Sequence, residues 1–282
     1  MFIADSQVHV WAADTPERPW PAQDGDLPRP HWPEPLSAQR LLQEMDAAGV
    51  ARAVLVSPSF EGTRNDLVCE TARQYPTRFA VMARFEPTLP GAREFMPRCR
   101  DLPGVRGVRL TFHRASTRAL LMGNGIDWLW RQAESLGLPV MVLASHADLP
   151  RIGEIAARHP ALKLAIDHLG LTEGRDDEAF HGFDQLLALA KYPNIAAKAS
   201  CVPLFTTDTY PYRRVHDRLR SAFDAFGVQR LFWGSDLSRL PCSYRQGITL
   251  YTEELDWLRG PELESVMGRA LCAWLDWPCG SP

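Results

Sequence analysis

The chain has 282 residues, of which 45% are hydrophobic and 23% are charged, and its formal net charge is −3. These values indicate a globular protein with a sizeable core. No basic run suggests a nucleic-acid partner. No apolar run approaches the roughly 20 residues of a membrane-spanning helix, so no membrane partner is expected, and the N-terminus lacks the pattern of a secretory signal.

The cysteines are scattered, without a CxxC pair or a short metal-binding spacing. In a chain of this length, that pattern predicts reduced thiols and a cytoplasmic location. The six positions are Cys69, Cys99, Cys201, Cys242, Cys272 and Cys279.

Short apolar runs alternate with longer stretches of helical period along the whole chain. The runs predict strands at Phe2–Val8, Ala53–Ser57, Phe79–Phe85, Val105–Leu110, Val140–Ala144, Lys163–Asp167, Ile195–Ala199 and Leu231–Gly234. The stretches between them predict helices near Ala38–Ala48, Asp66–Tyr75, Ala92–Arg100, Ile126–Leu136, Leu149–Arg158, Phe180–Tyr192 and Tyr212–Phe226. A helical tail is expected near Arg245–Leu258 and Glu262–Trp274.

Eight strands that alternate with helices favour a single (β/α)₈ TIM barrel domain over residues 1–282. The rival is an open doubly wound sheet, but no GxGxxG or GxxxxGK[ST] motif follows any strand. One segment breaks the alternation. Residues 12–35 hold seven of the 23 prolines, which predicts an irregular loop, either on the surface or as a wall of the pocket.

In a barrel of this kind, functional side chains lie where the strands end. The first strand alternates so that Asp5, Gln7 and His9 share one face. Two expectations have a structural alternative: His113 and His146 could cap turns, and Asp236 could cap a helix. Four other histidines, His31, His159, His181 and His216, are expected to face solvent. The candidates at strand ends are Gln7, His9, Arg84, Glu86, Arg109, His113, His146, Asp167, His168, Lys198, Ser200 and Asp236.

Three short motifs carry a resemblance to a known family. They are DSQVHVW at residues 5–11, IDHLG at 166–170 and LFWGSD at 231–236. In their order and strand placement they resemble the amidohydrolase superfamily, and within it the amidohydrolase 2 branch, which includes 2-pyrone-4,6-dicarboxylate lactonase and sugar lactonases.

The resemblance implies a (β/α)₈ barrel that hydrolyses a ring ester or a related bond. It implies that Asp236 acts on the attacking water, and that Gln7, His9 and His168 take the places of the family's histidines on strands one and six. Many superfamily members hold one or two divalent metals there, whereas the lactonase branch is expected to need none.

Gln7 stands where the family usually has a histidine, and an amide is a poor replacement for an imidazole ligand. The fifth strand also lacks the lysine or histidine of a binuclear site at its end. We therefore expect no required cofactor. The alternative is a single divalent ion such as zinc, held by His9, His168 and Asp236.

A lactone needs a base for water and donors for the developing oxyanion. We expect Asp236 as the base and N–H donors from His9, His168 and Gln7. Guanidinium groups pair with carboxylates, and arginines gather around the fourth strand. This arrangement predicts a carboxylated pyrone or a sugar lactone as the substrate. The expected substrate-binding residues are Gln7, Arg109, His113, His146 and Lys198, with Arg84, Arg106, Arg114 and Arg239 nearby.

Two other functions remain open from the sequence. One is a metal-dependent amidohydrolase or decarboxylase of the same superfamily. The other is a barrel that only binds a small acid, against which Asp236 argues, because an anion-binding pocket gains nothing from a carboxylate. A homo-oligomer is expected from the general habit of such barrels, and no segment indicates its interface.

Overall fold

The computed structural model describes residues 1–21 and 30–278. Eight strands form one sheet in chain order, and each pairs in parallel with the next. The strands are β1 (Ala4–Val8), β2 (Arg52–Val56), β3 (Phe79–Arg84), β4 (Val105–Thr111), β5 (Val140–Leu143), β6 (Leu164–Ile166), β7 (Ile195–Ser200) and β8 (Leu231–Gly234).

The first and last strands approach each other and nearly close the sheet into a barrel. Just beyond β8, the Asp236 N–H donates to the Gln7 carbonyl oxygen at 2.9 Å. Gly234 permits this approach, because a Cβ atom at that position would collide with Ser6 Oγ. The expected (β/α)₈ barrel is therefore confirmed.

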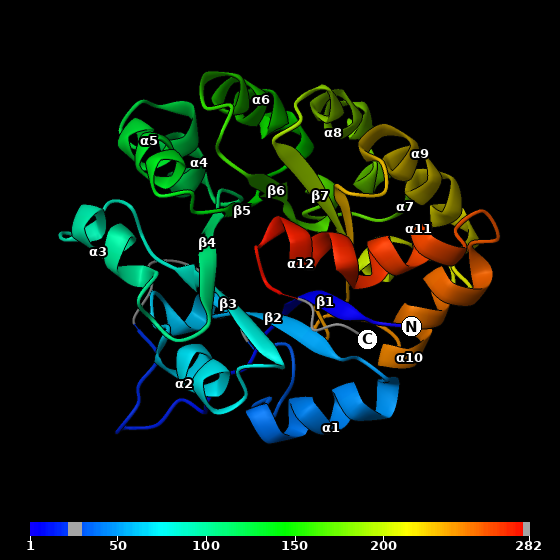
Figure 1. The fold of residues 1–282 in the computed structure, drawn as a ribbon, viewed down its shortest axis with the longest axis horizontal. Coiled ribbons are helices and arrows are strands. Elements are labelled where there is room, and N and C mark those ends of the chain that lie inside the picture. The colour runs from blue at the N-terminus through cyan, green and yellow to red at the C-terminus, as the bar shows by residue number, and fades with distance from the viewer. Residues whose placement is uncertain (22–29, 279–282) are drawn as a thin grey trace.

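Helices surround the strands, as Figure 1 shows. They are α1 (Ala38–Ala48), α2 (Asp66–Gln74), α3 (Ala92–Cys99), α4 (Ala115–Met122), α5 (Asp127–Ser135), α6 (Leu149–Arg158), α7 (Asp176–Ala179), α8 (Phe183–Ala188), α9 (His216–Phe226), α10 (Tyr244–Thr249), α11 (Gly260–Glu264) and α12 (Ala270–Trp274). The first one shows how local sequence sets these boundaries. The Ser37 side chain accepts a hydrogen bond from the Arg40 N–H at its start, and Gly49 ends it at φ 77°.

All eight predicted strands are present with boundaries within two residues of the prediction. The helices α1 and α6 match their predictions at both ends. The sequence analysis missed α4, a short helix directly after the β4 loop. The predicted helix over Phe180–Tyr192 is shorter in the structure, where α8 is followed by a 3₁₀ turn at Leu189–Lys191.

The interior of the barrel is a core of its own, closed at one end by the last helix. Side chains from seven of the strands fill it. They meet Leu271 of α12 and Leu275, which directly follows that helix. Gly268, just before that helix, lies against the backbone of Ala4 at the start of β1. In Figure 1, α12 crosses the strands on this side. The opposite end, where the strands finish, is left for the site. The strand residues of this core are Ala4, Val54, Val56, Ala80, Met82, Met141, Ala165, Ala196 and Phe232.

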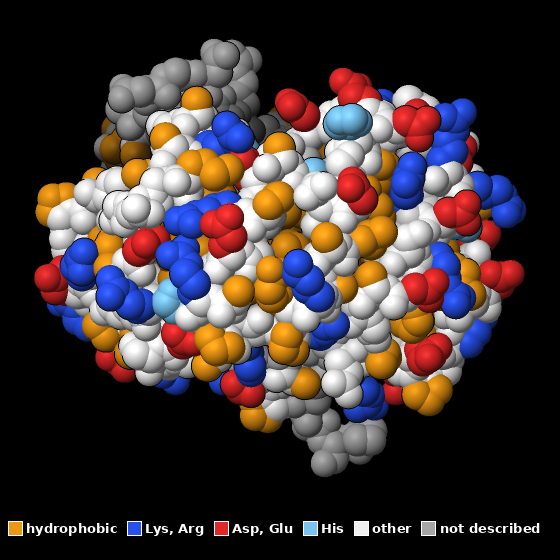
Figure 2. Space-filling view, turned by 90° about the horizontal axis from the view of Figure 1, so that it is seen from above, with side chains coloured by type: hydrophobic (Ala, Val, Ile, Leu, Met, Phe, Trp, Pro, Cys, Tyr) orange, Lys and Arg blue, Asp and Glu red, His pale blue; other side chains and the backbone are white. Residues whose placement is uncertain are grey.

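On the face drawn in Figure 2, acidic and basic side chains are interspersed, so neither sign of charge dominates that face. Within residues 1–21 and 30–278, no helix is long and apolar enough to cross a membrane. The five cysteines in the described part of the chain are free thiols. Cys279 lies outside the described residues.

Candidate active site

A cavity of about 240 Å³ opens at the carboxyl ends of the strands. A second cavity of about 400 Å³ adjoins it and shares Ser59, Arg109, Thr111 and His113 with it. The first cavity is lined by Gln7, His9, His31, Pro58, Ser59, Phe60, Arg109, Thr111, His113, Leu143, His168, Leu171, Thr172, Asp236 and Arg239.

His9 follows β1 and is held between the backbone of β2 and a carboxylate. Its Nδ1 lies 2.7 Å from the Val56 carbonyl oxygen, so Nδ1 carries a proton and donates it. Its Nε2 lies 3.1 Å from Asp236 Oδ1. The ring is therefore oriented with Nδ1 turned to β2 and Nε2 turned to Asp236.

Asp236 follows β8 and is 1% exposed. Its backbone lies in the left-handed region at φ 49°, a conformation that non-glycine residues adopt at a cost. Within the described residues, neither side-chain oxygen has a well-aligned hydrogen bond. Burial opposes its ionisation, but His9, His168 and Arg239 outweigh burial and hold the pKa of this carboxyl well below its ordinary value. The site therefore contains an ionised carboxylate with free acceptor capacity.

His168 follows β6, also in the left-handed region at φ 52°. Its Nδ1 lies 2.8 Å from Ser200 Oγ, and its Nε2 lies 3.3 Å from Gln7 Nε2 and 3.7 Å from Asp236 Oδ2. Burial lowers the pKa of His168 to about 4, against the attraction of the Asp236 carboxylate. This imidazole is therefore neutral near pH 7.

The Gln7 amide is oriented by a lysine. The Lys198 ammonium can only donate, and it contacts Gln7 Oε1, so Gln7 Nε2 is turned towards His168. Because an amide nitrogen only donates, His168 Nε2 must accept and Nδ1 must carry the proton. The expected role of His168 as an N–H donor to the substrate is not the one that this geometry favours.

A buried ion triad lies beneath this layer. Lys198 Nζ donates to Asp167 Oδ1 at 2.8 Å, and Arg109 Nε donates to Asp167 Oδ2 at 2.9 Å. Burial raises the pKa of Asp167, but Lys198 and Arg109 outweigh it and lower that pKa to about 2. Arg109 also reaches the cavity, whereas Lys198 is 0% exposed and does not line it.

Six of the eight expected site residues therefore line one cavity, and two do not. Lys198 lies below the cavity in the ion triad. His146 lies behind its wall, where its ring nitrogens face the carbonyl oxygens of Leu169 and His181 at 2.9 and 3.0 Å. Its contacts hold the loop after β6, so it is not placed to touch a substrate. The six that line the cavity are Gln7, His9, Arg109, His113, His168 and Asp236.

His31 is exposed, as expected, yet it also contributes to the site. It lines the cavity, its Nδ1 lies 3.1 Å from Ser238 Oγ, and its ring centroid is 6.4 Å from that of His9. Partial loss of hydration around the ring lowers the pKa of His31 to about 4. The described part of the proline-rich loop thus walls the pocket. The signal that could have found His31 is its place in the long loop after the first strand.

Positive charge gathers where the two cavities meet. Arg84 Nη2 donates to Thr111 Oγ1 at 3.1 Å, while its Nη1 is buried with no partner among residues 1–21 and 30–278. Burial, and next the Arg109 and Arg114 guanidinium groups, lower the pKa of Arg84 to about 9. Arg106 was expected near this group but lies elsewhere. It donates to the Asp276 carbonyl oxygen at the opposite end of the barrel.

The three side chains expected to hold a metal, if one binds, do converge, but their donor atoms do not suit it. His168 Nε2 already accepts from the Gln7 amide, and the Gln7 oxygen is taken by Lys198. Two free donors remain, His9 Nε2 and the Asp236 carboxylate, and they contact each other. In the part of the chain that the structure describes, no group of three or more His, Cys, Asp or Glu residues could hold a metal ion.

A nearly closed barrel with an ionised carboxylate, two imidazoles and guanidinium groups at its open end has the design of a barrel enzyme for a small polar molecule. Comparison with known proteins makes this class specific. A family model for amidohydrolases matches residues 4–274, and the chain belongs to this family.

Two curated relatives are named L-fucono-1,5-lactonase. The one from Burkholderia multivorans is 31% identical over 252 residues, which cover 82% of this chain and 80% of the relative. The one from Burkholderia ambifaria is 29% identical over 257 residues, covering 85% and 82% of the two chains.

Solved structures share the fold. A "probable" 2-pyrone-4,6-dicarboxylic acid hydrolase from Acinetobacter baumannii, with citric acid bound, superposes with a TM-score of 0.78 at 18% identity, covering 98% of this chain and 100% of that one. An amidohydrolase from Burkholderia multivorans with bound zinc superposes with a TM-score of 0.79 at 22% identity, covering 99% and 100%.

Proposed function

We propose that this protein hydrolyses a small lactone and that Asp236 activates the attacking water. The observation that carries the proposal is the state of Asp236. It is buried, ionised and free to accept, and it lies between His9 and His168 on the wall of the cavity. The lactonase names of the curated relatives support the same reaction class.

In the proposed reaction, water donates a proton to Asp236 as its oxygen attacks the ring carbonyl. The ring C–O bond then breaks, and Asp236 returns the proton to the leaving alkoxide, which yields a hydroxy acid and restores the carboxylate. The Arg239 guanidinium and the His9 ring, both on the cavity wall, are the groups placed to donate to the developing oxyanion. Each such donor is worth about 3 kcal/mol of transition-state stabilisation.

His168 takes a different part from the one expected from the sequence. Its Nε2 accepts a hydrogen bond from the Gln7 amide, so it leaves Asp236 Oδ2, 3.7 Å away, free to accept from the attacking water. Gln7 keeps its expected place on the cavity wall as an amide donor.

The arginine group favours a lactone that carries a carboxylate. The unpartnered Nη1 of Arg84 and the neighbouring Arg109 offer a pair of donors that a carboxylate fits. The second candidate is a neutral sugar lactone, favoured by the names of the relatives. Trp11, a candidate platform for a sugar ring, packs against Phe60 and does not line the cavity.

A pH-indicator assay on carboxylated pyrones and sugar lactones tests both candidates. The variant Arg84→Gln removes the free guanidinium donor but leaves Asp236 in place. For a carboxylated substrate, KM should rise by about 10-fold or more, as expected for a lost charge-assisted contact. An unchanged KM for every carboxylated lactone that turns over would assign the arginines another role.

Measuring the metal content of the purified protein, and its turnover after chelation, distinguishes the metal-free lactonase from a metal-dependent hydrolase or decarboxylase. We expect full turnover after dialysis against a chelator, since the donor set offers no complete site. Tightly held zinc whose removal abolishes turnover would refute the metal-free reaction.

The cytoplasmic location, the homo-oligomer and the absence of a nucleic-acid partner remain predictions from the sequence. So does the single domain over residues 1–282. Size-exclusion chromatography with light scattering would test the oligomer directly.

A further inference from the structure

We propose that Lys198 is a positioning residue that acts through Gln7 to fix the tautomer of His168, so that His168 Nε2 accepts from the Gln7 amide and does not donate to Asp236. The sequence analysis expected Lys198 to bind substrate. The inference depends on the proposed function for its kinetic consequence, while its structural claim can be measured without a substrate.

The burial of Lys198 is the first observation. The chain has only three lysines, and the ammonium of this one is fully buried in β7, 0% exposed. A buried ammonium is costly unless its protons are all directed to acceptors. Here they are directed to Asp167 Oδ1, to Gln7 Oε1 and, at 3.5 Å, to Met141 Sδ.

The direction of the hydrogen bonds is the second observation. The ammonium donates to the Gln7 oxygen, which leaves the Gln7 NH₂ group as the donor at 3.3 Å from His168 Nε2. At the far side of the ring, Ser200 Oγ lies 2.8 Å from Nδ1 and can accept its proton. The polarity of the whole chain is set at the lysine, because an ammonium cannot accept a hydrogen bond.

The consequence concerns the carboxylate. In the opposite tautomer, an Nε2–H group would oppose the Gln7 NH₂ group and turn to Asp236 Oδ2, 3.7 Å away. That carboxylate oxygen would then be engaged by the protein and lost to water. Lys198 therefore keeps Asp236 Oδ2 free to accept a hydrogen bond from water, although Lys198 itself does not line the cavity.

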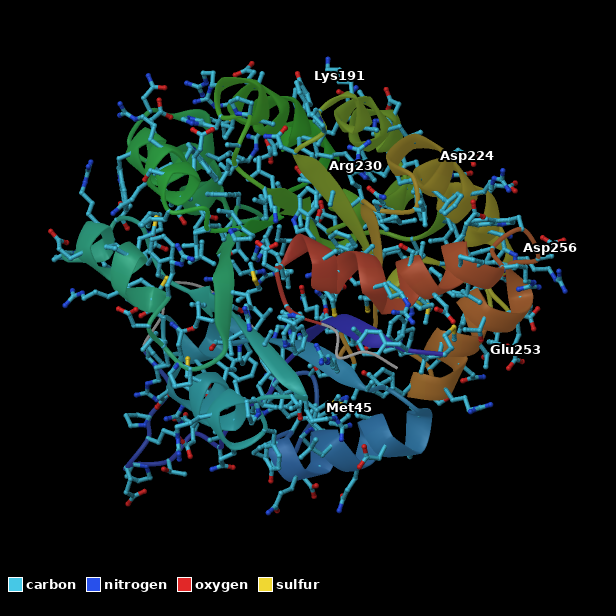
Figure 3. The ribbon with its side chains drawn as sticks, in the orientation of Figure 1. Met45, Lys191, Asp224, Arg230, Glu253 and Asp256 are labelled. Atoms are coloured by element: carbon cyan, nitrogen blue, oxygen red, sulfur yellow. The ribbon has the colours of Figure 1, made fainter. Side chains whose placement is uncertain are left out.

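The first test is Lys198→Met, with Lys191→Met as the matched control. Lys191 extends from the outer layer of helices, away from the strands, as Figure 3 shows, and it is exposed. Nitrogen-15 NMR of the labelled histidine rings reports which ring nitrogen carries the proton. In Lys198→Met the His168 ring should lose its single Nδ1–H form, and in Lys191→Met it should keep it.

Kinetics on the same variants separate positioning from binding. Lys198→Met should lower kcat by about 100-fold, within the range that a misplaced acid–base group costs, and should change KM by less than about 3-fold because Lys198 does not contact the substrate. A His168 spectrum that is unchanged in Lys198→Met would overturn the proposal, even if kcat fell.

Gln7→Glu is the second variant, which keeps the test decisive if Lys198→Met does not fold. A glutamate has nearly the same shape as glutamine and still pairs with Lys198, but it can only accept. The His168 tautomer should therefore invert to Nε2–H. Retention of the Nδ1–H form would contradict the inference. If the wild-type protein hydrolyses no lactone, the proposed function fails, and the two spectra still decide the role of Lys198.

Discussion

Two buried aspartates lie where β1 meets β8, and they differ in how many hydrogen bonds their carboxylates accept. Asp5 is 0% exposed, and its oxygens accept from the Gln7 N–H, the Ser235 N–H, the Ser235 hydroxyl and the Tyr244 hydroxyl. Asp236 is 1% exposed and has no well-aligned donor among the described residues.

Their pKa shifts also have opposite directions. Burial raises the pKa of Asp5 in spite of its hydrogen bonds. Burial acts on Asp236 too, but the neighbouring His9 and other cationic groups reverse it and lower the pKa of that carboxyl. The difference teaches that burial does not define a reactive carboxylate. The carboxylate oxygens of Asp5 accept hydrogen bonds that join β1 to the end of β8. Those of Asp236 accept no well-aligned hydrogen bond among the described residues.

The same substitution at both positions gives the largest contrast. Asp236→Asn should lower kcat by about 1,000-fold, since the amide cannot take a proton from water. Its free energy of unfolding should also fall at pH 7, because the groups that lower the pKa of Asp236 no longer have a carboxylate to act on. Lactone kinetics and urea unfolding measure the two quantities. Unchanged turnover would remove Asp236 from the mechanism.

Asp5→Asn should lower stability without a comparable loss of kcat, because Asp5 does not line the cavity. Its new NH₂ group would face hydroxyl donors, so buried polar groups lose partners, and the free energy of unfolding should fall by about 2 kcal/mol. Urea unfolding of this variant beside Asp236→Asn tests the comparison directly. A stability equal to that of the wild type would show that the Asp5 network is dispensable.

The pH dependence of stability should differ in sign between the two sites. For Asp236, with its lowered pKa, the unfolded chain binds more protons, so its contribution is present above about pH 4 and is lost as the pH falls further. For Asp5, with its raised pKa, the folded chain binds more protons, so stability falls as the pH rises from about 4 through the folded pKa. Unfolding free energies of wild type and both Asn variants between pH 3 and about 7 would show these opposite slopes. Parallel slopes would contradict the comparison.

A smaller effect sharpens the structural half of the comparison. Ser235→Ala removes one of the four donors to Asp5 and should cost about 1 kcal/mol of unfolding free energy. Because Ser235 does not line the cavity, kcat should stay close to the wild-type value. A large loss of kcat with little loss of stability would place Asp5 in the catalytic machinery after all.

The sequence predicted the strands because each is a short, buried and mostly apolar run between helices. Alternation predicted that Asp5, Gln7 and His9 would share one face. Gln7 and His9 do line the cavity, but Asp5 does not, and the register of β1 shifts between Asp5 and Val8. Alternation could not predict where a side chain turns once the strand has ended. His146 lies three residues beyond β5, in a 3₁₀ turn that directs its ring behind the wall.

Other features depend on contacts that no local pattern records. Lys198 satisfies the rule for a strand-end residue, yet its partners Gln7 and Asp167 come from β1 and the end of β6. His31 lies in a proline-rich loop without any period, so its place beside His9 follows only from the path of the loop across the barrel mouth. Hydrogen-bond direction, and with it the role of His168, follows from these distant partners.

The packing of α12 closes one end of the barrel, and the cavity of the described residues opens at the other end. Substrate that enters and product that leaves through this mouth would compete for it, so a bound hydroxy acid would block the next molecule. The carboxylate of the hydroxy acid would be attracted to Arg84 and Arg109, the same arginines that are proposed to bind the substrate. Progress curves should accordingly slow before the lactone is exhausted, with the acid competing against it for the unloaded enzyme.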